Sequence, residues 1–289
     1  MLDQILSSSP TTIVPGVYDA LSARVATRAG AKALYMTGFG VAGSAYGVPD
    51  IGIVSATEMV ERVTVLAHAA DGIPLIADGD NGHGGPLNCA KLTRAYERAG
   101  AAAIQLEDQV FPKKCGHMEN KEVVSRVEAA QKIRAAADAR GSKAFKIIAR
   151  TDARATHSLD EALRRGEDFL KAGADILFIE APRTGEEMRK VAETFAGVPL
   201  IANLVEDGKT PLLSVSELEQ LGYRIALYPI SALLAITRRL EEVYDLLLKG
   251  ERRNLDTHRV SFRHYNEIMK LPELLAVTEQ LAAANKEEI

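Results

Sequence analysis

Short, almost continuously apolar runs alternate along the chain with longer amphipathic stretches. Continuous apolar runs are typical of strands buried on both faces of a parallel sheet, and the stretches between them have the period of a helix. Several of these stretches begin at a residue suited to cap a helix, such as Ser55, Ser158, Thr184 or Ser214. The predicted helices cover residues 18–29, 55–70, 87–99, 123–140, 159–172, 185–196, 215–221 and 231–249.

A short sequence motif recurs, in which a glycine ends a helix-like stretch just before an apolar run. Gly30, Gly100, Gly173 and Gly222 occupy this place, where a left-handed residue is favoured. These four runs and four others that lack the motif predict eight strands. The strands are expected within residues 13–17, 28–38, 74–80, 98–108, 145–151, 171–181, 199–204 and 220–229. Such alternation makes parallel βα units, so we predict an α/β fold, a closed (β/α)8 TIM-type barrel.

No linker rich in Pro, Gly or Ser divides the chain, so we predict a single domain over residues 1–289. Residues 250–289 continue as a C-terminal helical extension whose apolar positions need a surface to cover. That surface is either the same barrel or another subunit.

Composition narrows the class of protein. The chain has 289 residues, of which 47% are hydrophobic and 26% charged, and its net charge of -4 creates no field that would attract nucleic acid or an anionic membrane. Two cysteines form no disulfide framework, and the N-terminus lacks the pattern of a signal peptide. We therefore expect a cytoplasmic protein that acts on a small molecule, with neither nucleic acid nor membrane as partner.

Charged side chains gather where the predicted strands end, which in a parallel barrel is where the site lies. Asp78, Asp80 and Glu107 lie at two such ends. A single carboxylate at a strand end is equally well explained as the cap of the following helix. Several carboxylates at the same end of the barrel, however, raise one another's pKa unless a cation neutralises them. Oxygen ligands without a His or Cys cluster select a hard ion, so we predict Mg2+, with Mn2+ as the alternative. Other strand-end residues are Tyr35, Thr37, Gly38, Arg150, Asp152, Glu180, Asn203, Tyr228 and Pro229.

Residues 38–43 fit the pattern G-x-G-x-x-G of a dinucleotide site. That fingerprint opens a long helix, whereas Gly47, Pro49 and Gly52 interrupt the next stretch here. We therefore favour a glycine-rich loop that presents backbone N–H groups to a substrate carboxylate, and keep an NAD-dependent dehydrogenase as an alternative.

Cys115 lies between two lysines and His117 in a predicted loop after the fourth strand. Neighbouring cations lower the pKa of a thiol, which suits acid–base chemistry, whereas one Cys and one His fall short of a zinc site. An inert loop cysteine is the alternative. Cys89, inside an apolar helix pattern, is expected in the core, and His83 either reaches the site or orients its own loop.

Taken together, these segments resemble the isocitrate lyase and phosphoenolpyruvate phosphonomutase superfamily. The resemblance covers most of the chain, and its most specific part is Lys-Lys-Cys-Gly-His at 113–117, which marks the lyase branches. The segments that carry it are PGVYDALSARVATRAG, YMTGFG, GVPDIG, ADGDNGHGG, QLEDQVFPKKCGHMENK, IIARTDAR, IANLVEDGKTP and ALYPISA.

The resemblance implies a barrel whose last helix is exchanged between subunits of a homotetramer. It also implies a role for each matching residue. Asp80 would bind Mg2+ directly, and Asp50, Asp78 and Glu107 would hold its water shell. Cys115 would be the acid, and Tyr35 would assist at the substrate hydroxyl. The carboxylates of the substrate would be bound by two groups: Thr37, Gly38 and Phe39 for the keto-acid carboxylate, and Arg150, Asn203, Gly116, His117 and Glu180, near Pro229, for the other carboxylate and its surroundings.

These parts suit a lyase that cleaves a 2-hydroxy acid to a 2-oxo acid and a saturated acid, because a metal stabilises the alkoxide that collapses. Met118 stands where methylisocitrate lyases carry Arg, and one cation fewer suggests one substrate carboxylate fewer. We therefore favour a 2-alkylmalate such as 2,3-dimethylmalate over 2-methylisocitrate. Pro229 does not separate these two, although oxaloacetate hydrolases usually have Ser there. The alternatives are oxaloacetate decarboxylation or hydrolysis on the same barrel, and a non-catalytic barrel used for assembly.

Overall fold

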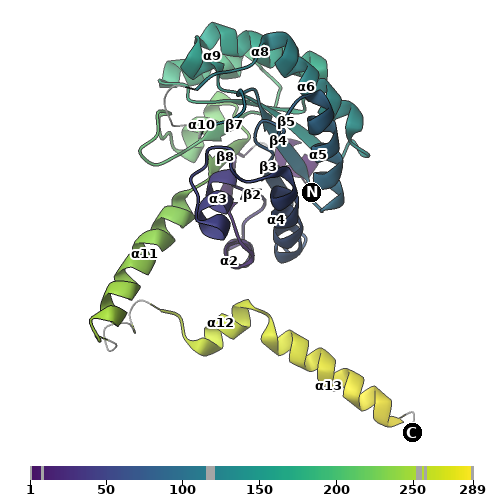
Figure 1. Ribbon diagram of the computed structural model, residues 1–289, viewed down its shortest axis with the longest axis vertical. Coiled ribbons are helices and arrows are strands. Elements are labelled where there is room, and N and C mark those ends of the chain that lie inside the picture. Colours follow the sequence, from purple (N-terminus) through teal and green to yellow (C-terminus); the bar gives the residue numbers. More distant parts are fainter. Residues whose placement is uncertain (1, 8–9, 115–120, 252–255, 257–258, 288–289) are drawn as a thin grey trace. The chain divides into compact units, whose positions relative to one another are not determined.

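A computed structural model describes residues 2–7, 10–114, 121–251, 256 and 259–287 (Figure 1). Contacts divide the chain into two compact units, residues 1–233 and 234–289. The prediction of a single domain with an extension from residue 250 stays a prediction. Among the described helices, none combines the length and apolar character needed to cross a membrane.

The first unit is built on eight parallel strands, one at each predicted run, and only β1 extends beyond its run, by one residue. They lie in the order β6-β5-β4-β3-β2-β1-β8-β7, and an isolated parallel bridge between Leu177 and Leu200 joins the two end strands. The sheet is therefore a nearly closed barrel, as predicted. The strands are β1 Thr12–Val17, β2 Leu34–Met36, β3 Leu75–Asp78, β4 Ala103–Glu107, β5 Lys146–Thr151, β6 Ile176–Ile179, β7 Ile201–Asn203 and β8 Ile225–Tyr228.

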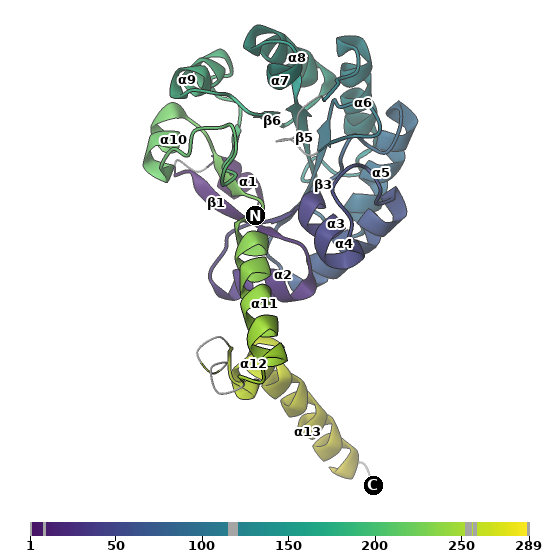
Figure 2. The same cartoon turned by 60° about the vertical axis from the view of Figure 1, so that its left-hand side comes forward.

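Helices surround the strands, as Figure 2 shows for α4, α5, α6, α8, α9 and α10. The four predicted caps are confirmed, because Ser55, Ser158, Thr184 and Ser214 each accept a backbone N–H of the first turn. The helices at predicted places are α2 Ala20–Arg28, α4 Ala56–Ala69, α5 Pro86–Arg98, α6 Arg126–Ala139, α8 Leu159–Ala172, α9 Gly185–Thr194, α10 Val215–Leu221 and α11 Ser231–Leu248.

Two short helices and one site helix go beyond the prediction. They are α1 Leu2–Ser7, α7 Ala153–Thr156 and α3 Gly38–Tyr46. The expectation of a glycine-rich loop at residues 38–43 was wrong: Thr37 caps α3 by accepting Gly40 N–H, and the helix ends at Gly47 in the left-handed conformation. The second unit contains most of α11, from Leu234 onward, then α12 Phe262–Ile268 and α13 Leu271–Glu287.

The apolar core has two layers. One lies between the strands and the surrounding helices, and the other fills the barrel, where Leu2 of α1 joins side chains from the strands. Tyr35, Phe178 and Leu227 belong to this inner layer and also line the pocket described below. The packed barrel interior thus forms the floor of the site.

Candidate active site

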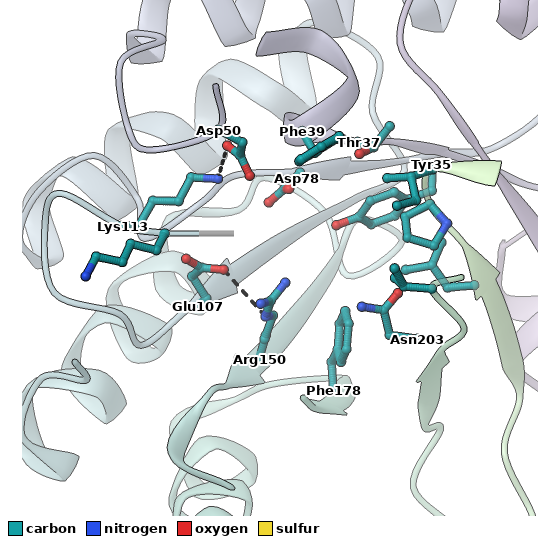
Figure 3. Close-up of a pocket in the computed structure, with 15 residues that line it drawn as sticks. Tyr35, Thr37, Phe39, Asp50, Asp78, Glu107, Lys113, Arg150, Phe178 and Asn203 are labelled. Carbon is teal, nitrogen blue, oxygen red and sulfur yellow. Dashed lines mark hydrogen bonds and ion pairs between the residues drawn. The ribbon is translucent and has the colours of Figure 1, made fainter. Parts of the chain in front are cut away.

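A pocket lies at the carboxyl ends of the strands (Figure 3). Nine of the predicted site residues line it, together with six others. The lining residues are Tyr35, Thr37, Phe39, Asp50, Asp78, Glu107, Lys113, Lys114, Arg150, Phe178, Asn203, Val205, Leu227, Pro229 and Ile230.

Buried carboxylates form one side of the pocket, and a lysine lies among them. Nζ of Lys113 lies 2.7 Å from Oδ1 of Asp80 and also pairs with Asp50, and its side chain is only 4% exposed. Burial lowers the pKa of Lys113, but Asp80, Asp50 and the other carboxylates raise it well above its usual value. Lys113 is therefore a charged ammonium in the acidic cluster, a role that the sequence did not predict.

The carboxylates are costly to ionise together. Burial and then Asp80 raise the pKa of Asp78 to about 6. Burial also raises the pKa of Asp50, and that of Glu107 well above its usual range. Oε1 of Glu107 is buried without a hydrogen-bond partner among the described residues. A divalent cation would neutralise more of this negative charge than one ammonium does, and would lower the cost of ionising the carboxylates together.

The loop that carries Asp80 is held in an unusual conformation. Asp80 and His83 have φ values of 48° and 52°, in the region that favours glycine. Oδ1 of Asn81 accepts His83 N–H, so Asn81 shapes the loop. Burial lowers the pKa of His83, whose Nε2 lies 3.7 Å from Asp80 Oδ2, and a neutral imidazole therefore faces the cluster.

A hydrogen-bonded chain connects Tyr35 to the acidic cluster. Tyr35 donates to Gln105 Oε1 at 2.7 Å, and Gln105 Nε2 donates to Asp78 Oδ1 at 3.2 Å. Burial and then Asp78 raise the pKa of Tyr35 well above its usual value, so the phenol stays protonated. Gly38 N–H at the start of α3 donates to Asp78 Oδ2 at 3.2 Å, so this helix terminus faces a carboxylate. A pyrophosphate would meet that charge, which argues against a dinucleotide here.

Arg150 forms the opposite side of the pocket. Its guanidinium carbon lies 5.2 Å from the centre of the Phe178 ring, and Nε lies 3.5 Å from Glu107 and 3.8 Å from Glu180. Asn203 donates its Nδ2 to Glu180, which is fully buried. The wall between Arg150 and β8 is apolar, with Phe178, Val205, Leu227, Pro229 and Ile230.

Three predicted site residues lie behind the pocket surface. They are Gly38, Asp80 and Glu180, each in contact with a lining residue. Cys115, Gly116 and His117 lie outside the described residues. Cys89 is buried on α5, and burial raises the pKa of its thiol to about 11, as expected for a core cysteine.

Among the described residues, no three acidic, His or Cys side chains are spaced as a preformed metal site. Mg2+ takes only one or two carboxylates directly and keeps several waters, so the oxygen donors still suit it chemically. The sequence missed Lys113, Gln105 and Phe178 as pocket or network residues. Lys113 carried a signal, since it sits in the Lys-Lys-Cys-Gly-His segment, but its partner Asp50 is far away in sequence.

A (β/α)8 barrel with acidic residues and an arginine facing each other across the strand ends is typical of an enzyme that acts on a small molecule. The chain belongs to the phosphoenolpyruvate mutase/isocitrate lyase superfamily, since the family described as phosphoenolpyruvate phosphomutase matches residues 2–248.

Similar proteins narrow the class further. The chain is 45% identical to 2,3-dimethylmalate lyase of Eubacterium barkeri, over 96% of both chains. It is 42% identical to 2-methylisocitrate lyase of Bacillus subtilis (strain 168), over 84% of this chain and 79% of the relative. A crystal structure of a 2,3-dimethylmalate lyase superposes with a TM-score of 0.91 at 38% identity, covering 97% of this chain and 94% of that one. The chain is therefore a lyase of this superfamily.

Proposed function

We propose that the chain is a Mg2+-dependent carbon–carbon lyase that cleaves a 2-alkylmalate of the 2,3-dimethylmalate type to pyruvate and propionate. The observation that carries this proposal is the composition of the pocket. Acidic residues lie on one side with Lys113 and Lys114, Arg150 is the one arginine among the described lining residues, and Phe178, Val205, Leu227, Pro229 and Ile230 form an apolar wall. A second alkyl group suits such a wall, whereas the third carboxylate of 2-methylisocitrate would need a cation beside that wall, where the described lining has apolar side chains.

The metal would be held by Asp80, with Asp50, Asp78 and Glu107 around it. The fit rests on donor chemistry: these are hard oxygen donors, Asp78, Asp80 and Glu107 are buried, and an oxygen of Glu107 has no hydrogen-bond partner among the described residues. When bound, Mg2+ would polarise the hydroxyl and carboxylate of the substrate.

The protein's own residues would handle the charge and the protons. Because Tyr35 is neutral and already donates to Gln105, its oxygen accepts a hydrogen bond from the substrate hydroxyl. The hydroxyl proton would pass to a carboxylate of the acidic cluster, because the pKa values of Asp78 and Glu107 are raised. The bond between carbons two and three then breaks, the oxygen on carbon two becomes a carbonyl, and the electron pair stays on carbon three. Arg150 would stabilise the carboxylate of this leaving fragment, and Cys115 would protonate carbon three to give propionate.

The test is a panel of 2-hydroxy di- and tricarboxylates assayed with Mg2+ for released pyruvate. Turnover should be highest with 2,3-dimethylmalate and lower with 2-methylisocitrate. The reverse order would favour the methylisocitrate reaction, and release of acetate or carbon dioxide from oxaloacetate without cleavage of either alkylated acid would favour the oxaloacetate reaction.

We also propose that the C-terminal residues associate with another copy of the chain, as the superfamily resemblance implies for a homotetramer with exchanged helices. The described part of residues 234–289 exposes many large apolar side chains that a stable protein covers. They include Leu240, Tyr244, Leu247, Leu248, Phe262, Leu274, Leu275 and Leu281. Light scattering of the full chain tests this proposal, with a monomeric mass as the opposing result.

A further inference from the structure

A buried carboxylate behind the pocket holds Arg150 on one edge. Oδ2 of Asp152 accepts Nε of Arg150 at 2.9 Å, and Oδ1 accepts Nη2 at 3.1 Å. Asp152 is completely buried and is absent from the described lining of the pocket. The pair is therefore a bidentate one that solvent does not reach.

A second cation binds the same carboxylate. Nζ of Lys121 lies 2.5 Å from Oδ1 of Asp152, and the Lys121 side chain is 1% exposed. An arginine paired with one carboxylate offers little net charge to an anion. Because Lys121 shares the Asp152 carboxylate, Asp152 neutralises less of the charge of Arg150, so the pocket edge of Arg150 attracts a carboxylate more strongly than it would without Lys121.

The backbone of Asp152 is also fixed. Its N–H donates to Asp108 Oδ1 at 2.9 Å, and Asp108 Oδ2 accepts Thr151 Oγ1 at 2.6 Å and Arg165 Nη1 at 2.9 Å. The end of β5 is thus tied to the end of β4 and to α8. Asp152 has little freedom to follow Arg150 if the guanidinium turns.

The geometry leaves one edge of the guanidinium for a ligand. In the described part of the chain, Nη1 of Arg150 makes no hydrogen bond, and Arg150 lines the pocket. A carboxylate takes two parallel N–H groups from one edge of an arginine. Glu107 and Glu180, at 3.5 and 3.8 Å from Nε, are the competing acceptors to which the guanidinium would turn without Asp152.

We propose that Asp152 is a positioning residue for Arg150, with Lys121 as its charge partner. Asp152 aims the Nη1–Nη2 edge at the substrate carboxylate and keeps it away from Glu107 and Glu180. This inference rests on the proposed function, in which Arg150 binds a substrate carboxylate.

The variants are Asp152→Asn and Lys121→Met, each made in the wild-type chain and in Arg150→Met. Glu187→Gln is the matched control, because Glu187 forms a similar bidentate pair with Arg154 at 2.6 and 2.8 Å outside the described pocket lining. Thermal unfolding establishes that each variant folds. If Asp152→Asn does not fold, Lys121→Met, which leaves the Asp152–Arg150 pair in place, carries the test.

Two readouts separate this inference from the proposed function. The first is kcat and KM for 2,3-dimethylmalate with Mg2+. The second is calorimetric binding of 2,3-dimethylsuccinate, which has both carboxylates but no hydroxyl and is therefore not cleaved.

We expect Asp152→Asn to lower kcat/KM by about 10- to 100-fold, the scale of a misplaced positioning group, and to weaken dimethylsuccinate binding. Lys121→Met should act mainly on KM and on binding. Both effects should shrink to about twofold in the Arg150→Met chain, because residues that act through one partner are not additive. Glu187→Gln should change neither readout.

Equal losses with and without Arg150 would overturn the inference, as would Asp152→Asn and Lys121→Met variants that bind dimethylsuccinate like the wild type. If the wild type binds dimethylsuccinate but cleaves no 2-alkylmalate, the proposed function fails while the binding comparison still decides the inference. If the wild type binds no dimethylsuccinate but cleaves 2,3-dimethylmalate, the proposed function stands and the comparison of kcat and KM decides the inference. If it neither binds the one nor cleaves the other, both are wrong.

Discussion

Nζ of Lys113 lies 2.7 Å from Oδ1 of Asp80, so a positive charge of the chain itself stands beside the carboxylate expected to bind the metal. The same ammonium pairs with Asp50. An ammonium and a divalent cation repel each other at such short range, and they draw on the same oxygen atoms. Lys113 and the metal are therefore linked through Asp50 and Asp80.

Replacing Lys113 by Met should tighten Mg2+ binding by about tenfold, because the variant loses a competing charge. Calorimetric titration with MgCl2 measures the change. Lys114→Met is the matched control, since it removes one positive charge from the adjacent lining residue, and it should change the affinity much less. Weaker Mg2+ binding in Lys113→Met would show that the lysine supports the metal instead of competing with it.

The stabilisation of the fold by Mg2+ should depend on pH. Burial and Asp80 raise the pKa of Asp78 to about 6, whereas an unfolded Asp has a pKa of about 3.9. Between these values the folded chain keeps a proton that the unfolded chain has lost, so the contribution of Asp78 to the free energy of unfolding falls as pH rises and stays low above pH 6. A bound cation favours the ionised form of Asp78. Mg2+ should therefore add most to the free energy of unfolding at pH values where this carboxyl group has lost its proton.

Thermal unfolding with EDTA or saturating MgCl2, at about pH 5, 6, 7 and 8, tests this expectation. The increase in Tm on adding MgCl2 should grow as pH rises through the region of the Asp78 pKa and then level off. An increase in Tm that is the same at all four values would contradict the role of Asp78.

Much of the fold could be predicted from the sequence because its signals are local. Each glycine motif, each helix cap and each apolar run depends on residues near one another in the chain. The structure has strands and caps at the predicted positions. The strand-end rule also brought Asp78, Glu107, Arg150 and Asn203 to one pocket.

The contacts that tune the site could not be predicted in this way. Lys113 pairs with Asp50, and Lys121 with Asp152, across distances in the sequence that no period encodes. The helix α3 was missed because its glycines disfavour a helix, while the Thr37 cap and packing of Val41 in the core stabilise it.

Replacing Cys115 by Ser should lower kcat for 2,3-dimethylmalate by about two to four orders of magnitude, the range for loss of a general acid. A hydroxyl has a far higher pKa than a thiol and gives up its proton less readily. Binding of 2,3-dimethylsuccinate should change little, because the variant keeps the arginine and the acidic residues. Near-normal turnover would exclude Cys115 as the acid and would favour a reaction that needs no proton on the leaving fragment.

Gly82 lies in the loop that carries Asp80. Replacing Gly82 by Ala should lower the free energy of unfolding more than the same change at Gly30. Gly82 has a φ of 80°, and a Cβ there would lie 2.2 Å from Sγ of the buried Cys89. The left-handed conformation costs a non-glycine residue about 1–2 kcal/mol, and overpacking adds about 1–3 kcal/mol. Gly30→Ala is the matched control, because its φ is 92° but nothing lies within 4 Å of the new Cβ.

The two variants separate backbone strain from steric overlap, as measured by urea unfolding. Gly30→Ala should lose only about 1–2 kcal/mol from strain, and Gly82→Ala more. Combining Gly82→Ala with Cys89→Ala removes the overlapping sulfur and should recover part of the loss relative to Cys89→Ala alone. Because Asp80 lies two residues before Gly82 in the same strained loop, Gly82→Ala should also weaken Mg2+ binding, whereas Gly30→Ala should not. Equal losses of stability in both glycine variants would show that the loop moves away from Cys89 at little cost.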